Sequence, residues 1–347
     1  MAESLLTGYP AFTAQMLCRR LIANGDNVRV LARPKYFEDA KQFIKTCEGP
    51  GTAQVIIGDV VQMDLGMSGP DVRQMLRELE YIYHLAAISP RSERMDNARQ
   101  VNVEGTRSIL DMAMSAERLQ RFCFFSTAFV SGTRRGVVLE SELDRGQRFR
   151  TVFEQTKFEA EKLVRRAASD LNVTIFRPSL VVGHSQTGEF DQSDDPYHMM
   201  LSFLNAPLNI HMPLPGHGDF PLNMVPVDYV CEAAYQISRD PRSAGRTFHL
   251  TDPNPLPARR VLDLIADHGK RKRPRGTIHP GIARRILKLP GIRKMGTPAR
   301  VVNYFDQLVI YNTTNTLELL AGSTLQCPSF DSYVGNLVTH LQQVARI

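Results

Sequence analysis

The segment Leu5-Leu6-Thr7-Gly8-Tyr9-Pro10-Ala11-Phe12-Thr13-Ala14 decides the fold of this chain of 347 residues. It joins a short apolar run, which predicts a strand, to a helical pattern over residues 12–23. Gly8 stands in the turn between them, where dinucleotide-binding folds place glycine so that the backbone can approach a pyrophosphate at the helix N-terminus. Ala11 and Ala14 occupy the second and third glycine positions of that motif. The segment predicts a strand-turn-helix unit, and the two alanines weaken the prediction of cofactor binding.

Short apolar runs and longer helical patterns alternate along the first half of the chain. Strands are predicted at 28–31, 55–57, 81–85, 122–125 and 173–176, and helices at 37–46, 72–80, 97–116 and 154–168. This alternation predicts an α/β fold, a Rossmann-type doubly wound parallel sheet with ligands at the carboxyl ends of its strands. Beyond Gly183 the pattern becomes irregular and rich in Pro, Gly and His up to Pro226, which predicts loops facing a substrate.

The change of pattern at Gly183 divides the chain into two predicted units. Residues 1–183 form a Rossmann dinucleotide-binding domain, to which strands return around 223–252. Residues 184–347 form a smaller C-terminal region that is mainly substrate-binding and helical, with a basic segment at 270–300.

The composition predicts a soluble cytoplasmic protein with a substantial core. Hydrophobic residues make up 43% of the chain, no apolar run is long enough to span a membrane, and the N-terminus MAESLLTG lacks the pattern of a signal peptide. The five cysteines are far apart and form no CxxC pair, which favours reduced thiols over disulfides or a zinc site. We expect no metal, because the histidines of the irregular segment do not have the spacing of a metal site.

The net charge of +6 is concentrated in one segment. Eleven Lys or Arg residues and no Asp or Glu lie between Lys270 and Arg300, which leaves about −5 on the rest of the chain. One interpretation is a solvated basic face. The other is a docking surface for an acyl carrier protein, a phosphopantetheine arm or an anionic membrane surface, since Ile282, Ile286 and Leu289 could form an apolar stripe there. A nucleic-acid partner is not expected, because the segment contains no aromatic residue.

The ends of the second and fourth predicted strands carry residues suited to a cofactor. Arg33 ends the second strand, where an arginine can pair with a ribose 2′-phosphate, so the sequence favours NADP(H) over NAD(H). Ala86 and Ala87 follow the fourth strand, and their small side chains would let a cofactor pass close to the backbone.

Thr127, Phe153 and Lys157 have the spacing that carbonyl reduction needs, but one hydroxyl is missing. Thr127 follows the fifth strand, and Lys157 lies one helical turn beyond Phe153. The Thr127 hydroxyl could hold a carbonyl oxygen, a phenol at position 153 would donate the proton, and Lys157 would lower the pKa of that phenol. Phe153 cannot donate a proton. Water held by Thr127 and Lys157, or Tyr197 from across the cleft, could supply it instead.

The order of these segments resembles the extended short-chain dehydrogenase/reductases, closest to the thioester-reductase and fatty acyl-CoA reductase branch, the male-sterility-type NAD-binding domains. The resemblance covers about three quarters of the chain. It rests on Thr7 to Ala14, Arg33, Gly58-Asp59, His84 to Ala87, and the segments 102–106, 126–127, 153–163, 176–183, 223–230 and 249–253.

The resemblance implies hydride transfer from NADPH to a thioester, aldehyde or ketone, with a catalytic set of Thr127, position 153 and Lys157. It also implies a homodimer. The cofactor-binding residues that it implies are Thr7, Gly8, Pro10, Ala11, Phe12, Arg33, Asp59, Val60, Leu85, Ala86, Ala87, Asn102, Lys157, Pro178, Ser179 and Leu180.

Three functions remain open from the sequence. The first is an NADP-dependent reductase of a carbonyl or thioester with an altered proton donor. The second is a catalytically impaired dinucleotide sensor or interaction protein that keeps the fold. The third, a sugar-nucleotide epimerase or dehydratase relative, would need the same missing tyrosine and fits the segment 177–183 less well.

Overall fold

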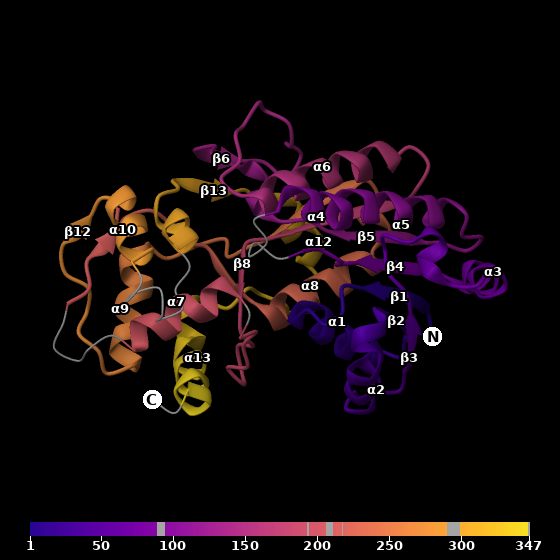
Figure 1. Cartoon of the computed structure of the whole chain (residues 1–347), viewed down its shortest axis with the longest axis horizontal. Coiled ribbons are helices and arrows are strands. Elements are labelled where there is room, and N and C mark those ends of the chain that lie inside the picture. The colour runs from indigo at the N-terminus through magenta and orange to yellow at the C-terminus, as the bar shows by residue number, and fades with distance from the viewer. Residues whose placement is uncertain (89–93, 193, 206–210, 217, 290–298, 346–347) are drawn as a thin grey trace.

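In a computed structural model of the chain, described for all residues except 89–93, 193, 206–210, 217, 290–298 and 346–347, seven parallel strands form one sheet (Figure 1). Across the sheet the strands are β3 (Thr52–Ile57), β2 (Asn27–Ala32), β1 (Glu3–Thr7), β4 (Tyr81–His84), β5 (Arg121–Phe125), β7 (Val173–Pro178) and β11 (Arg246–Leu250). The six predicted strands of the first half are all present, and β11 is a seventh that returns to the sheet. The doubly wound parallel fold predicted from the sequence is confirmed.

Helices cover both faces of this sheet, so its central strands are almost entirely buried. One face carries α1 (Phe12–Ala23), α2 (Phe37–Lys45), α8 (Val227–Arg239) and α12 (Thr314–Leu320). The other carries α3 (Gly69–Glu78), α5 (Gly105–Met114) and α6 (Val152–Ala167) (Figure 1). All five residues of β5 and all six of β7 are buried between these layers.

The helix predicted over 97–116 is divided in two. The structure has α4 (Met95–Arg99), a π-helical turn (Gln100–Glu104) and then α5. Such turns are frequent at functional sites, and this one lies next to the loop that follows β4.

A second core lies beside the carboxyl ends of the strands. It is built from α7 (Asp195–Leu204), α9 (Ala258–His268), α13 (Phe330–Ala345) and a 3-10 helix (Ala299–Phe305), with α10 (Pro280–Leu287) packed on that 3-10 helix. Outside the main sheet, the described residues also form three two-stranded parallel pairs, namely β8 (Leu180–Val182) with β10 (Met224–Pro226), β9 (Leu214–Pro215) with β12 (Thr277–Ile278), and β6 (Gly136–Val138) with β13 (Val309–Tyr311).

The prediction that residues 183–226 are irregular was wrong for α7. Eight of its ten residues are buried, Asp195 and Ser202 among them, so α7 lacks the solvent-exposed polar face of a surface helix. The division of the chain at residue 183 stays a prediction.

Candidate active site

A crevice opens where the strand order of the sheet reverses, between β1 and β4. Gly8 follows β1 and Ala86 follows β4, and both line a cavity of about 510 Å³. Gly8 has a φ of +108°, and a Cβ atom there would lie 2.9 Å from the carbonyl carbon of Leu85. Only glycine fits this turn, which brings the backbone close to whatever occupies the crevice. Ligands of doubly wound folds bind at this switch point.

The N-cap of α1 lines the same cavity, and the helix start favours an anion. Ala11 caps the helix and lines the cavity, and the first turn contains no acidic side chain. The N–H groups of a first helical turn have no partner inside the helix and carry partial positive charge. Ala11 has an extended backbone, with φ −57° and ψ 138°, so its methyl group is accommodated without strain. The site therefore fits the pyrophosphate of a dinucleotide.

Half of the predicted cofactor-binding residues line this cavity. They are Gly8, Pro10, Ala11, Arg33, Asp59, Val60, Ala86 and Ala87. At one end the exposed Arg33 guanidinium lies 5.3 Å from the centre of the Tyr36 ring, which also lines the cavity. Arg33 thus places positive charge at the end of β2.

Thr7 and Asn102 lie behind the cavity wall rather than in it. The Thr7 hydroxyl is 2.8 Å from Nδ1 of the buried His84 and accepts a hydrogen bond from the Ala86 amide. Asn102 accepts a hydrogen bond from the Ile88 amide at 2.7 Å. Burial, with a smaller contribution from the charge of Lys157, lowers the pKa of His84 to about 3, so this imidazole is neutral. These residues hold the loop after β4 in place. Phe12 and Leu85, also predicted, pack against the core.

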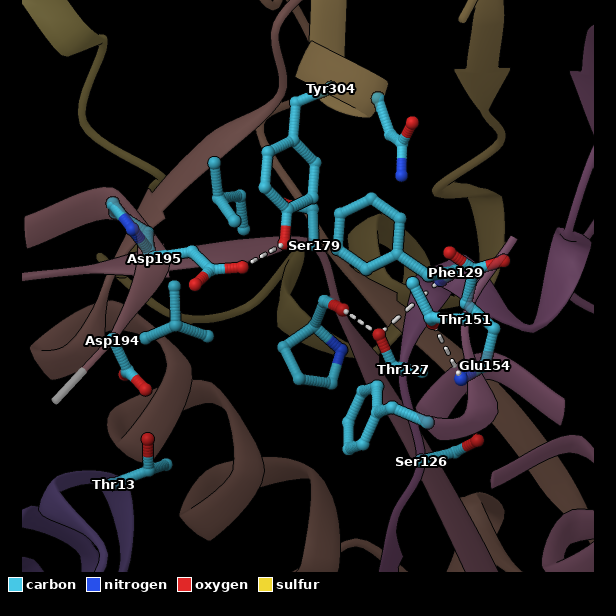
Figure 2. Close-up of a pocket in the computed structure, with 16 residues that line it drawn as sticks. Thr13, Ser126, Thr127, Phe129, Thr151, Glu154, Ser179, Asp194, Asp195 and Tyr304 are labelled. Carbon is cyan, nitrogen blue, oxygen red and sulfur yellow. Dashed lines mark hydrogen bonds between the residues drawn. The ribbon is translucent and has the colours of Figure 1, made fainter. Parts of the chain in front are cut away.

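A second cavity, of about 190 Å³, contains Thr127 and Phe153 (Figure 2). Pro178, Ser179 and Leu180, predicted to bind cofactor, line this cavity instead of the first one. Asp194 lines both cavities, so the two adjoin. That the strand ends after β1 and β5 serve one site stays a prediction.

The Thr127 hydroxyl is held in the second cavity by the backbone. It donates a hydrogen bond to the carbonyl of Pro178 at 3.4 Å and accepts one from the amide of Phe129 at 3.3 Å. Both bonds are long, so the hydroxyl can turn towards a ligand oxygen at small cost.

Lys157 is buried beneath the site, and its amine points to the sheet. Its Nζ donates a hydrogen bond to the carbonyl of Phe125 at 2.5 Å and lies 4.5 Å from the centre of the Phe124 ring. Burial lowers its pKa to about 7, although the charge of Glu161 acts in the opposite direction. Lys157 is not among the residues that line either cavity.

A buried ionic network fixes α6 to the strands that carry the site. Glu161, one turn after Lys157, accepts hydrogen bonds from Arg177 at 2.6 and 3.0 Å and from Ser126 at 2.6 Å. Glu161 and Arg177 are both fully enclosed. Arg165 also donates to Glu161, at 2.9 Å. Since Ser126 and Arg177 flank Thr127 and Pro178, the network sets the position of both walls of the second cavity.

Sequence reasoning missed several polar residues of the second cavity, among them Asp194, Asp195, Asn303 and Tyr304. Tyr197, considered as a substitute phenol, is instead buried in the second core, where its ring packs on Phe190. The phenol that lines the cavity is Tyr304. Asp194, which caps α7, and Asp195, its first residue, had a helix-start signal in the following Pro196. Nothing in the sequence pairs Tyr304 with Thr127.

No cluster of three or more His, Cys, Asp or Glu side chains suited to a metal ion occurs among the residues that the structure describes. Among the helices of the same residues, none is long and apolar enough to cross a lipid bilayer. All five cysteines are free thiols.

The crevice and the sheet order define an NAD(P)-binding protein of the extended short-chain dehydrogenase/reductase type. Residues 6–234 match the family model described as male sterility protein, and the chain belongs to this family. The resemblance found in the sequence is thereby confirmed.

Known relatives include parts of large synthetases and fatty acyl-CoA reductases. The chain is 25% identical to a linear gramicidin synthase protein of Brevibacillus parabrevis over 95% of its own length but only 7% of that protein. It is 27% identical to fatty acyl-CoA reductase 1 of Xenopus laevis, over 51% of this chain and 42% of that one. The chain thus spans less than half the length of these curated relatives.

Solved structures have the same fold. The terminal R domain from the myxalamid PKS-NRPS biosynthetic pathway has a TM-score of 0.83 and 25% identity, covering 100% of this chain and 92% of that one. A thiolation-reductase di-domain from an archaeal non-ribosomal peptide synthetase has a TM-score of 0.78 at 17% identity, over 99% of this chain and 76% of the di-domain, and shows the shared fold.

Proposed function

We propose that this chain is an NADPH-dependent reductase of the carbonyl carbon of an acyl thioester or an aldehyde. The observation that carries the proposal is that the crevice at Gly8 adjoins the cavity of Thr127, with Asp194 in the wall of both. In this arrangement NADPH, bound along the crevice, would supply a hydride to a carbonyl carbon held in the second cavity. The Thr127 hydroxyl donates a hydrogen bond to the carbonyl oxygen, where negative charge develops.

Arg33 and the start of α1 support NADPH as the cofactor. Arg33 would pair with the 2′-phosphate, and the turn at Gly8 with the first turn of α1 would hold the pyrophosphate. Lys157 would reach the nicotinamide ribose by turning from the Phe125 carbonyl. Position 153 contributes an apolar ring to the cavity wall and no proton.

The test combines binding with turnover on defined probes. NADPH fluorescence should change on titration with the protein, and NADPH absorbance should fall when octanoyl-CoA or octanal is added. Absence of NADPH and NADH binding at high micromolar concentration would refute the reductase. A dinucleotide sensor is the second candidate, since Phe153 has no hydroxyl and the Lys157 amine bonds to the sheet. Binding of NADPH without oxidation by either probe would favour it.

For the substrate, we propose an acyl group carried on a carrier protein. The carrier protein docks at the basic surface of α10. Ile282 is 50% exposed, Ile286 is 37% exposed and Leu289, which follows the helix, is 53% exposed. The exposed Arg285 and Lys288 lie in the same stretch. The residues 290–298 of the predicted basic segment lie outside the described part of the chain. Exposed apolar side chains beside like charges fit an acidic protein surface.

Charge reversal tests the docking surface. Arg285→Glu with Lys288→Glu should raise KM for an acyl group on an acidic carrier protein about tenfold or more at low salt. The same variant should leave KM for octanoyl-N-acetylcysteamine, which carries no charge, unchanged. Equal effects on the two substrates, or none on either, would refute docking at α10.

A further inference from the structure

Tyr304 supplies a phenol hydroxyl to the cavity that Phe153, which has no hydroxyl, also lines. It lines the same cavity as Thr127 and Phe153, although it lies on the 3-10 helix Ala299–Phe305, far along the chain. Figure 2 shows the Tyr304 hydroxyl pointing into the cavity, with Thr127 across from it. The Thr127 hydroxyl and the Tyr304 phenol thus line one cavity of about 190 Å³.

Phe129 links these two walls. Its amide donates to the Thr127 hydroxyl at 3.3 Å, and its ring centre lies 5.5 Å from that of Tyr304, with the two rings tilted by 51°. This is a favourable spacing for an aromatic pair. The Tyr304 ring is therefore positioned against the residue that also fixes Thr127.

The segment that carries Tyr304 is anchored on both sides. Val301, Val302 and Phe305 are at most 3% exposed. Asn303, which also lines the cavity, accepts a hydrogen bond from Arg284 of α10 at 2.8 Å. The phenol is thus presented by a packed element, as an acid-base group requires.

Asp195 holds the Tyr304 hydroxyl in a way that leaves its proton easy to redirect. The hydroxyl donates to Oδ2 of Asp195 at 3.3 Å, which is longer than the usual 2.5–3.0 Å of an O–H···O bond. Asp195 is buried and stands in the first turn of α7, where the helix dipole stabilises a carboxylate. A substrate oxygen that offers a shorter bond can take the phenol proton in its place.

We propose that Tyr304 is the proton donor of this site, in place of the phenol that is absent at position 153, with Asp195 as its positioning residue. The assignment rests on the proposed reductase function. In the reduction of an aldehyde RCHO, the carbonyl carbon gains a hydride from NADPH and the oxygen becomes an alkoxide. Tyr304 gives its proton to that oxygen, the product RCH2OH leaves, and the phenolate regains a proton from water.

Reduction of a thioester to an aldehyde depends less on a proton from Tyr304. The hydride adds to RCO–SR′, the resulting oxyanion re-forms a carbonyl group, and the C–S bond breaks to release a thiolate. The thiolate takes its proton from water, since a thiol has a pKa near 8.5, whereas an alkoxide is close to hydroxide in basicity. The proton donor therefore governs the step from aldehyde to alcohol more than the step from thioester to aldehyde.

The decisive variant is Tyr304→Phe, which removes one oxygen and keeps the ring. Octanal reduction should fall on the order of 10²–10⁴-fold, the usual contribution of a positioned acid. Reduction of octanoyl-CoA should fall much less, so that the product changes from octanol to octanal. A purely structural role would lower both rates together, and this outcome would overturn the assignment.

Binding to the protein without cofactor gives a readout independent of turnover. Octanamide offers an unreactive carbonyl oxygen, and Tyr304→Phe should weaken its binding about tenfold by calorimetry, the value of one lost hydrogen bond. Tyr197→Phe is the matched control, because it removes a phenol hydroxyl from α7 in the second core. It should leave the octanamide affinity and the ratio of octanal to octanol unchanged. Unchanged octanamide affinity in Tyr304→Phe would count against the assignment.

Failure of the assignment can be told apart from failure of the proposed function. If the wild-type chain reduces octanal and Tyr304→Phe reduces it equally fast, the assignment alone is wrong. If the wild-type chain binds NADPH but reduces neither octanal nor octanoyl-CoA, the reductase function and the assignment are both wrong.

Discussion

The amine of Lys157 donates a hydrogen bond to the carbonyl oxygen of Phe125 across 2.5 Å, so that α6 is bonded to the end of β5 beneath the site. Phe153, one turn earlier on α6, offers this amine no hydroxyl. Lys157 is 2% exposed, and burial lowers its pKa to about 7. The lysine thus contributes a bond within the structure, and its charged form is costly at neutral pH.

Lys157 should make the stability of the fold depend on pH above neutrality. The unfolded chain keeps the lysine proton up to a pH of about 10.4, whereas the folded chain loses it near pH 7. Between these values the unfolded state binds more protons, so the free energy of unfolding rises with pH, by at most about 1.4 kcal/mol per pH unit.

Urea unfolding at pH 7, 8 and 9 gives the free energy of unfolding at each pH. The increase with pH that Lys157 causes in the wild type should be absent in Lys157→Met. Lys162→Met is the matched control, because Lys162 lies on the same helix but is 38% exposed and pairs with Asp144. It should keep the wild-type slope. A Lys157→Met variant with that same slope would show that this lysine is not the group responsible.

Phe153→Tyr should restore proton donation where Tyr304 has been removed. The substituted ring lines the Thr127 cavity, so a phenol hydroxyl at position 153 would stand beside the proposed carbonyl site. In the Tyr304→Phe background, octanal reduction should rise at least tenfold. In the wild-type background the gain should be smaller, since Tyr304 already supplies the proton. No gain in either background would indicate that position 153 cannot present a hydroxyl to the substrate.

The sequence predicted cavity-lining residues that directly follow the strands of the sheet. It did not predict those that later segments of the chain contribute to the same cavities. Gly8, Arg33 and Ala86 line the crevice as predicted, because parallel strands place their carboxyl ends at one edge of the sheet. Thr7 and Asn102 were assigned to the cofactor, but they face the protein, a distinction that depends on side-chain direction rather than spacing.

The missing parts of the prediction have a common cause. The helix α7 is largely buried and lacks the exposed polar face of a surface helix. Tyr304 lies on a short 3-10 helix whose packing against Phe129 depends on the tertiary fold. No local pattern places Tyr304 opposite Thr127. The sequence thus located much of the wall of the crevice at Gly8, but not Asp195 or Tyr304 in the wall of the Thr127 cavity.

Ala11→Gly should strengthen NADPH binding without destabilising the protein. Ala11 caps α1 and lines the crevice, and glycine is a better N-cap residue than alanine. Removal of its methyl group also lets a pyrophosphate approach the backbone more closely. Fluorescence titration should show a lower Kd for NADPH.

Ala14→Gly provides the matched control in the same helix. Ala14 is fully buried inside α1 and does not line the crevice. The variant should lose about 1 kcal/mol of stability and keep the wild-type Kd. If Ala11→Gly left the Kd unchanged as well, the methyl group would not obstruct the cofactor.

Arg33→Ser should reduce the preference for NADPH over NADH. The side chain stands at the end of the crevice, and only NADPH carries the 2′-phosphate that it could bind. Loss of one charge-assisted contact predicts about tenfold or more weaker NADPH binding with little change for NADH. Lys35→Ser is the control, since Lys35 also lies over the Tyr36 ring but does not line the crevice. Equal loss of both cofactors in Arg33→Ser would argue against a phosphate contact.

Glu161→Gln should destabilise the protein strongly, because it leaves buried positive charge without its partner. Burial alone would raise the pKa of Glu161, but the charge and hydrogen bonds of Arg177 outweigh it and lower the pKa. The wild-type chain should therefore lose stability as the pH falls below the usual carboxyl range, about 4.3. Removal of one partner of a buried ion pair costs about 3–5 kcal/mol, measurable by urea unfolding at pH 7.

Glu159→Gln, on the same helix, separates this effect from the loss of a surface pair. Glu159 bonds to Arg99, which is 53% exposed, so its replacement should cost less than about 1 kcal/mol. Since Ser126 and Arg177 also depend on Glu161, the Glu161→Gln protein that remains folded should bind octanamide more weakly as the walls around Thr127 shift. Equal stabilities for the two variants would mean that the network is not what holds α6 to β5 and β7.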